Sequence, residues 1–355
     1  MLGELTPRRL GSTSLVVPPI GIGGWPIGGP DHNLGMPTGW STGADAAASL
    51  AGLETAWELG ARLFDTADVY GHGRSERLIG SLVSQVPRGE IVLSSKVGYF
   101  AGTAPHGFAP AHMRRQLEQT LENLGTDRLD IYSLHHPDFG PQERYLEPAV
   151  EVMHALKREG LITAIGMRGP HRFALERVRR TEEQVPDKVE RFRRLFGLVQ
   201  PDVLSVRDNL LSPPERSEGV FAYAREHGVG VLVTKPLGQG LLTGKYTALV
   251  PTAFGQGDHR ASKPWFKPTA IAELEKGLAE LRRLVGDTDD DLIRLALWSC
   301  LDRSEHAVPL VGFTSAEQIR QNILCLSGPR PSAHVIAQAR TIMSAAQARA
   351  TNAMD

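Results

Sequence analysis

The 355-residue chain is poor in cysteine and has no long apolar segment. Its two cysteines, Cys300 and Cys325, lack the C-x-x-C spacing or histidine partners that mark zinc sites, and the pair argues against a disulfide framework. No apolar run is long enough to span a bilayer, and the start of the chain lacks the apolar core of a secretory signal. We therefore expect a cytoplasmic protein that binds no metal.

Excess charge of either sign is also missing. The formal net charge is −1 and the isoelectric point is about 6.9, so bulk charge does not recruit nucleic acid or an anionic membrane. With 41% hydrophobic and 22% charged residues, the composition is typical of a soluble globular protein. A small-molecule substrate is the expected partner, and the sequence does not indicate an oligomeric state.

The chain instead contains a repeated alternation of short β-branched runs with amphipathic helical stretches. There are eight runs: VVPPIGIGG, ARLFDTA, EIVLSSKV, RLDIYSLH, LITAIGM, DVLSVRD, VGVLVTK and HAVPLVGF. Their apolar character favours parallel strands covered by helices, and eight such units close most naturally into a (β/α)8 TIM barrel. Because no linker interrupts the alternation, residues 1–355 are predicted to form a single α/β barrel domain.

An open doubly wound sheet is the rival architecture, because it also alternates strands and helices. That fold would require a glycine-rich dinucleotide loop that opens a helix directly after the first strand. The segment GIGGWPIGG contains a proline and continues into a long loop, so it fits this motif poorly. The barrel is therefore the favoured interpretation.

Two segments, near 171–200 and 247–270, are longer than a barrel scaffold requires. The first is strongly charged and is predicted to be helical with a break at Pro186. The second follows the seventh run and carries Trp265 and Phe266. Both would begin at the end of the barrel where active sites are built, so we expect them to cover or select the substrate. Solvated surface insertions are the alternative.

Four reactive side chains stand at the ends of three successive runs: Asp65, Tyr70, Lys96 and His135. The carboxyl ends of parallel strands meet at one mouth of a barrel, so these groups should gather there. A phenol can donate a proton, an adjacent ammonium lowers its pKa, and a carboxylate compensates the buried lysine. An imidazole can orient a substrate oxygen. The combination suits carbonyl reduction, although each residue taken singly also has a structural interpretation.

Six blocks, in order along nearly the whole chain, resemble the aldo-keto reductase superfamily: RRLGSTSLVVPPIGIGGW, FDTADVYGHGRSERLIG, LGTDRLDIYSLHHPD, KREGLITAIGM, PLGQGLLTGKY and VGFTSAEQIRQNI. The bacterial and potassium-channel β-subunit branch looks most similar. The resemblance implies an N-terminal β-hairpin before the barrel and a catalytic tetrad at Tyr70, Asp65, Lys96 and His135. It aligns His135 with the family histidine, and strand alternation would point His136 to the opposite side.

The resemblance also assigns nicotinamide contacts, and here the chain departs from the family. Arg168 and Gly169 stand where the family has a Ser-Asn pair for the carboxamide. Ser205 replaces the usual glutamine, and Thr234 replaces an aromatic that often stacks on the ring. Every nicotinamide contact that can be aligned has changed.

Of the residues expected at the pyrophosphate and adenosine, some match the family and others do not. The pyrophosphate would lie on a turn that contains Lys235, Pro236, Leu237 and Gly238. The adenosine-side positions are Gly312, Thr314, Gln318 and Asn322, of which Asn322 matches the family. The resemblance implies NADPH as the cofactor. Because Thr314 and Gln318 replace the basic residues that hold its 2′-phosphate, NADH is the alternative.

Three cations, Arg168, Arg207 and Lys235, lie at or just after the fifth, sixth and seventh runs. Near a nicotinamide ring, such charges would favour the neutral dihydropyridine by about 1 kcal/mol. Alternatively they would bind a substrate carboxylate or phosphate, or pair with local acids such as Asp208. Substrate contacts are expected from Trp25, His136, Arg207 and Trp265.

The leading functional hypothesis is nicotinamide-dependent reduction of an aldehyde, ketone or sugar-like carbonyl, with Tyr70 as proton donor. A second hypothesis is a cofactor-independent general acid/base lyase, dehydratase or isomerase that uses the same tetrad on an anionic substrate. The third is a nucleotide-binding regulatory subunit, which the channel-subunit resemblance permits.

Overall fold

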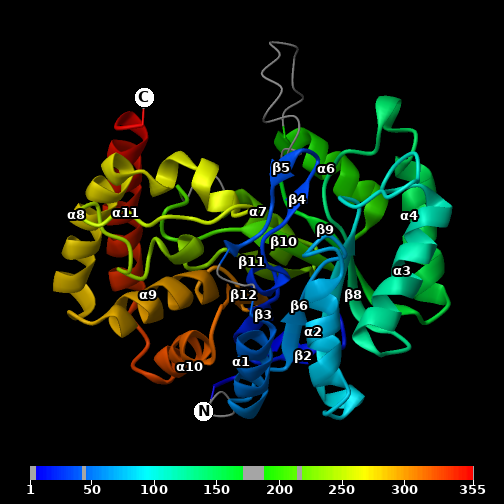
Figure 1. The fold of residues 1–355 in the computed structure, drawn as a ribbon, viewed down its shortest axis with the longest axis horizontal. Coiled ribbons are helices and arrows are strands. Elements are labelled where there is room, and N and C mark those ends of the chain that lie inside the picture. The colour runs from blue at the N-terminus through cyan, green and yellow to red at the C-terminus, as the bar shows by residue number, and fades with distance from the viewer. Residues whose placement is uncertain (1–4, 42–44, 171–187, 214–217, 355) are drawn as a thin grey trace.

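The computed structural model describes residues 5–41, 45–170, 188–213 and 218–354. Eight parallel strands close into a barrel, with β12 returning to pair with β3 (Figure 1). In order around the barrel they are β3 (Gly21–Gly23), β6 (Leu63–Asp65), β7 (Val92–Val97), β8 (Leu129–Leu134), β9 (Ile162–Arg168), β10 (Val203–Arg207), β11 (Gly230–Thr234) and β12 (Ala307–Gly312). Each coincides with one of the eight predicted runs, with β9 extending one residue beyond its run to Arg168, so the predicted TIM barrel is confirmed.

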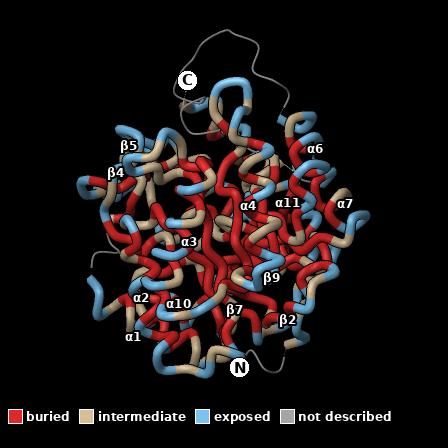
Figure 2. The backbone as a smooth tube through the Cα atoms, turned by 90° about the vertical axis from the view of Figure 1, so that its right-hand side faces the viewer, coloured by how far each residue is buried: buried red, intermediate tan, exposed pale blue. Residues whose placement is uncertain are grey.

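Helices surround these strands and bury their outer faces. They are α1 (Ala46–Glu58), α2 (Arg74–Val83), α3 (Pro110–Leu124), α4 (Leu146–Arg158), α6 (Lys188–Val199), α7 (Glu218–Glu226), α8 (Pro268–Val285), α9 (Asp289–Leu301), α10 (Ala316–Leu324) and α11 (Ala333–Asn352). The predicted helix over AHMRRQLEQTLENLG is α3, which ends at Gly125 in the left-handed conformation with φ 64°. Figure 2 shows how completely the helices cover the strands, whose residues are mostly buried.

An antiparallel hairpin of β1 (Arg8–Arg9) and β2 (Val16–Val17) precedes the barrel, as the resemblance implied. Leu10, Leu15 and Val17 join one buried cluster with inward-facing strand residues, so the hairpin closes the N-terminal end of the barrel. The first predicted run therefore proves to be two elements. Pro18 and Pro19, which lack backbone N–H donors, separate the hairpin strand from β3.

The two predicted insertions differ in what the structure describes. Residues 171–187, with Pro186, lie outside the described part, and the remainder of the first insertion is α6. The second contains the short 3-10 helices η8 (His259–Ser262) and η9 (Pro264–Phe266). Phe266 and Trp265 pack into a hydrophobic cluster with α8, α9 and α11, and Figure 1 shows α8 and α11 side by side at one flank of the barrel. This part of the insertion is thus anchored to a second core.

Both cysteines are buried and unpaired with each other. Among the described residues, no helix has the length and apolarity to cross a bilayer, and no cluster of three or more histidine, cysteine, aspartate or glutamate side chains is arranged to hold a metal ion.

Candidate active site

The interior of the barrel changes from apolar to polar along its axis. Near the hairpin, the inward side chains are Leu63, Ile131, Ala164, Val203 and Leu232. Because side chains alternate along a strand, the residues two or four positions further face the same interior. Those residues are Asp65, Ser133, His135, Arg168, Ser205 and Thr234. The carboxyl ends of the strands therefore form a polar mouth.

Lys96 and Asp65 form a buried ion pair at this mouth. The Lys96 Nζ donates to Asp65 Oδ2 and to the Thr66 carbonyl, each at 2.6 Å. The second Asp65 oxygen accepts a hydrogen bond from Ser94 Oγ at 2.8 Å. Burial has the largest single effect and disfavours the charge of Lys96, but the charges of Asp65 and Tyr70 and the hydrogen bond to Asp65 together outweigh it, so the pKa of the ammonium is raised. The lysine is therefore charged at neutral pH.

Tyr70 lies against this pair, with its ring centroid 5.1 Å from Lys96 Nζ. Burial raises the pKa of the Tyr70 phenol, while the charge of Lys96, a hydrogen bond with it and the charge of Arg168 lower the pKa. The net pKa is above the ordinary value, because burial dominates. The lowering by Lys96 that the sequence predicted is present, but burial exceeds it. The phenol is protonated at neutral pH and is ready to donate.

His135 completes the predicted group. Its ring meets the Tyr70 ring edge-on, with centroids 5.8 Å apart, and its backbone N–H donates to the Val97 carbonyl at 3.0 Å. Asp65, Tyr70, Lys96 and His135 thus come together at one place, as the strand-end argument predicted.

His136 does not point away from its neighbour as alternation predicted. β8 ends at Leu134, and the rings of His135 and His136 both contact Tyr99, with centroids 4.8 Å and 4.6 Å away. Burial lowers the pKa of His136 to about 4, so this imidazole is neutral. Its Nδ1 accepts a hydrogen bond from the Asp138 N–H at 3.2 Å. The two histidines therefore flank one aromatic ring, and only His135 reaches Tyr70.

An aromatic wall stands on the other side of Tyr70. Trp25 stacks on Tyr70 at 6.2 Å, and His259 lies 4.4 Å from Trp25. Trp40 packs against both Trp25 and His259. The predicted substrate residue Trp25 is therefore beside the proton donor, while Trp40 and His259 were not singled out from the sequence.

A buried ion pair fixes this wall. The guanidinium of Arg260 binds Asp258 and lies 3.8 Å over the Trp40 ring. Asp258 also accepts hydrogen bonds from the Ser41 N–H and hydroxyl, each at 2.8 Å. Although burial acts against its charge, hydrogen bonds from Arg260 and Ser41 hold the pKa of Asp258 well below its usual range. The 257–260 segment is thereby tied to the loop that follows β3.

The His259 imidazole inside this wall is uncharged. Burial and the nearby charge of Lys235 lower its pKa to about 3. Its Nδ1 lies 3.1 Å from the Gly39 carbonyl, and Gln239 contacts its Nε2. With this ring neutral, the positive charge that acts on Tyr70 and Trp25 comes from Lys96, Arg168 and Lys235.

The predicted pyrophosphate turn winds tightly through several residues in the left-handed region. Lys235, Gly238, Gln239 and Gly240 all have positive φ, between 58° and 93°. The Asn209 side chain braces the turn, since its Nδ2 donates to the Lys235 carbonyl at 2.8 Å. Lys235 Nζ lies 4.8 Å from the Trp25 ring centroid. Binding of a pyrophosphate at this turn stays a prediction, and Asn209 is a bracing residue that the sequence did not reveal.

The predicted adenosine-side residues lie at the start of α10 and within it. Asn322 is 5% exposed, and within the described part of the chain its side-chain amide has no hydrogen-bond partner. Thr314 and Gln318 bond to each other, because Gln318 Oε1 accepts from the Thr314 N–H and hydroxyl. The contact of Asn322 with a base stays a prediction, and Thr314 and Gln318 carry no positive charge.

Two predicted substrate residues remain. Arg207 ends β10 on the same face as Val203 and Ser205, and it is exposed. Trp265 packs against the α8, α9 and α11 cluster. Their contact with substrate stays a prediction.

Comparison with known proteins agrees with this geometry. The aldo/keto reductase family profile matches residues 19–340. The chain belongs to the aldo/keto reductase family. It is 27% identical over 331 residues to the NADH-specific methylglyoxal reductase of Escherichia coli (strain K12), covering 90% of this chain and 92% of the relative. The enzymes of this family are NAD(P)H-dependent oxidoreductases that act on small molecules, and so is this chain.

Other similarities extend across the barrel. L-galactose dehydrogenase of Arabidopsis thaliana is 26% identical over 328 residues, covering 90% of this chain and 88% of that protein. A putative voltage-gated potassium channel subunit beta of Schizosaccharomyces pombe is 25% identical, covering 89% of this chain and 86% of that protein. The solved glycerol dehydrogenase of Gluconobacter oxydans superposes with a TM-score of 0.71 at 21% identity, covering 96% and 95% of the two chains, which shows the shared fold.

Proposed function

We propose that this aldo/keto reductase reduces an aldehyde, ketone or sugar-like carbonyl with Tyr70 as the proton donor. The observation that carries the proposal is the contact of a protonated phenol with a buried, charged lysine at the polar mouth of the barrel. When bound, the nicotinamide cofactor supplies the hydride that reaches the carbonyl carbon. The chain's own residues orient and protonate the carbonyl oxygen.

Each member of the tetrad has a distinct part in that step. Tyr70 transfers its phenolic proton to the carbonyl oxygen as negative charge develops there, and becomes a phenolate. The Lys96 ammonium stabilises this phenolate, and Asp65 keeps the lysine charged and oriented. His135, which packs against the Tyr70 ring, orients the same oxygen. Proton transfer from water restores the phenol.

For the cofactor, we propose that Asn322 meets the adenine and that the turn at 235–240 receives the pyrophosphate. Ser205 and Thr234 face the mouth at the nicotinamide end. The neutral Thr314 and Gln318 support use of NADH at least as readily as NADPH, and the E. coli relative is named for NADH specificity.

Absorbance of the dihydronicotinamide tests this function. We expect carbonyl-dependent oxidation of NADH or NADPH across a panel of aldehydes, ketones and sugars. No oxidation, together with no binding of either cofactor by calorimetry, would reject the proposal. Turnover of a carbonyl substrate without any cofactor would instead favour the acid/base lyase or isomerase hypothesis, which the arginine at the nicotinamide position motivates.

A further inference from the structure

The segment between β3 and α1 contains a short antiparallel hairpin of β4 (His32–Asn33) and β5 (Met36–Pro37) (Figure 1). Successive side chains of an extended chain point to opposite faces. His32 is exposed, whereas Asp31 and Asn33 on either side of it are partly buried. Asp31 and Asn33 therefore share the face of the hairpin that is turned toward the rest of the protein.

Asp31 contacts the turn that follows the proton donor. His72 lies two residues after Tyr70, and its Nδ1 is 3.1 Å from Asp31 Oδ1, within ion-pair distance. The backbone of His72 is left-handed, with φ 47°, which is unfavourable for a residue with a β-carbon. The His72 ring also meets the Phe100 ring edge-on, with centroids 5.5 Å apart. The contacts with Asp31 and Phe100 thus stabilise a turn that would otherwise be strained.

The chain just before the hairpin lies directly on the backbone of Tyr70. A β-carbon at Gly28 would lie 2.9 Å from the Tyr70 carbonyl carbon, and one at Gly71 would lie 2.2 Å from the Gly28 carbonyl oxygen. The contact of Asp31 with His72 joins the same two segments a few residues further along. The placement of the hairpin is therefore coupled to the placement of the Tyr70 backbone.

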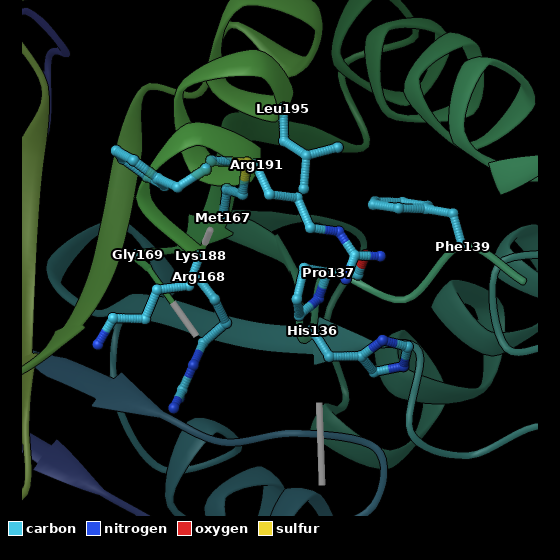
Figure 3. A pocket seen from close by; sticks show the side chains of 10 residues that line it. His136, Pro137, Phe139, Met167, Arg168, Gly169, Lys188, Arg191 and Leu195 are labelled. Atoms are coloured by element: carbon cyan, nitrogen blue, oxygen red, sulfur yellow. The ribbon is translucent and has the colours of Figure 1, made fainter. Parts of the chain in front are cut away.

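Asn33 contacts the residue that packs against the tetrad histidine. Its Nδ2 donates to the Tyr99 carbonyl at 3.0 Å. The Tyr99 ring meets the rings of both His135 and His136 edge-on. His136 in turn borders a small pocket that Met167 also lines (Figure 3). Tyr99 therefore links the hairpin to the imidazole that packs on the proton donor.

We propose that Asp31 and Asn33 are positioning residues for carbonyl reduction. Asp31 fixes the turn that presents Tyr70, and Asn33 fixes Tyr99 against His135. The inference rests on the proposed function, since it concerns the proton donor and the histidine that orients the same oxygen. Because a misplacement of about 1 Å at the reacting groups can lower the rate about 10²-fold, contacts made two residues from the donor have a measurable effect on kcat.

Variants of the first contact test the role of Asp31. Asp31→Ala should lower kcat about tenfold or more and leave the binding of NADH or NADPH, measured by calorimetry, unchanged. Asp31→Asn keeps an oxygen at the same place and should recover most of the loss. His72→Gly breaks the contact from its other side at a backbone conformation that glycine adopts freely, and it serves if Asp31→Ala folds poorly. His32→Ala is the matched control, because this exposed side chain lies on the opposite face of the hairpin.

Double variants separate positioning from general loosening of the fold. If Asp31 acts through the phenol, Asp31→Ala should have little further effect on the residual activity of Tyr70→Phe, which has no phenolic proton to place. Asn33→Ala should lower kcat about three- to tenfold in the wild type and should have little further effect in His135→Phe. General loosening would instead lower kcat by the same factor in each background.

The outcomes separate this inference from the proposed function. The positioning role is overturned by an unchanged kcat in both Asp31→Ala and His72→Gly, by an equal loss in His32→Ala, or by an equal further loss in the Tyr70→Phe background. Carbonyl reduction stands in each of those cases. Failure of the wild type to oxidise NADH or NADPH with any carbonyl overturns the proposed function itself.

Discussion

The two ends of the barrel interior differ in polarity: one end is apolar and the other is charged and polar. At the N-terminal end, the hairpin residues Leu10 and Val17 pack with inward strand residues such as Leu232 in a dry cluster. At the C-terminal end, the same strands present a buried ion pair, a phenol and several cations. One end contributes stability through apolar burial, and the other maintains charged groups that are costly to bury. The predictions below test this division.

The largest expected effect is on catalysis at the polar end. Tyr70→Phe removes the proton donor but keeps the ring that stacks on Trp25. We expect kcat/KM for carbonyl reduction to fall by about 10²–10⁴-fold, since general acid catalysis contributes that much. The thermal midpoint should change little. Retention of most of the wild-type activity would show that another group protonates the oxygen.

The buried ion pair should control stability as well as activity. Asp65→Leu leaves the Lys96 ammonium buried without its partner, and the free energy of unfolding should fall by about 3–5 kcal/mol. Combining it with Lys96→Met removes the unpaired charge and should recover part of that loss. Urea denaturation of both variants measures the difference. Equal destabilisation of the single and double variants would mean that the charge itself is not the cause.

Substitutions at the apolar end should lower stability without changing substrate binding. Leu232 is 1% exposed, and Leu232→Ala should lower the free energy of unfolding by about 2–5 kcal/mol through lost burial and a cavity. At a temperature where the variant stays folded, its KM for a carbonyl substrate should equal that of the wild type. A large change in KM would contradict the assignment of stability to the apolar end and of substrate binding to the polar end.

The neutral buried histidines make stability depend on pH. Their pKa values, about 4 for His136 and about 3 for His259, lie below the ordinary 6.5, so the unfolded chain binds more protons as pH falls. Stability from each imidazole is complete above pH 6.5 and is lost as the pH falls toward those values, by at most about 1.4 kcal/mol per pH unit. Between pH 7 and 4, the free energy of unfolding measured by denaturation should decline less steeply in His136→Phe than in the wild type. An unchanged slope would contradict the buried neutral state.

The smallest expected effect concerns cofactor choice. Gln318→Arg places a cation at the position that the family uses for the 2′-phosphate. NADPH should then be favoured over NADH several-fold relative to the wild type, as about 1 kcal/mol for a solvent-exposed ion pair predicts. The ratio of kcat/KM values with the two cofactors measures it. No change in that ratio would place the 2′-phosphate elsewhere.

Strand periodicity and strand-end chemistry predicted the barrel and the meeting of Asp65, Tyr70, Lys96 and His135, because parallel strands fix which residues share the mouth. The behaviour of the phenol's pKa could not be predicted, since burial is a property of the packed site. Nor could the side of β8 on which His136 lies, because alternation stops where the strand ends at Leu134.

The aromatic wall was beyond prediction for another reason. Trp40 and His259 meet where Asp258 binds Ser41 and His259 binds Gly39, contacts that span more than 200 residues of sequence, and no local pattern encodes them. The motif GDHR, with an acid and a base two residues apart beside a histidine, was the one available signal.

The pH dependence of carbonyl reduction tests the role of Tyr70 most directly. Because the pKa of the phenol is raised above 10.0, kcat/KM for the wild type should stay level through neutral pH and fall only at strongly alkaline pH, where the donor loses its proton. The residual activity of Tyr70→Phe should lack that alkaline fall. An alkaline fall of the same position and depth in Tyr70→Phe would contradict proton donation by Tyr70.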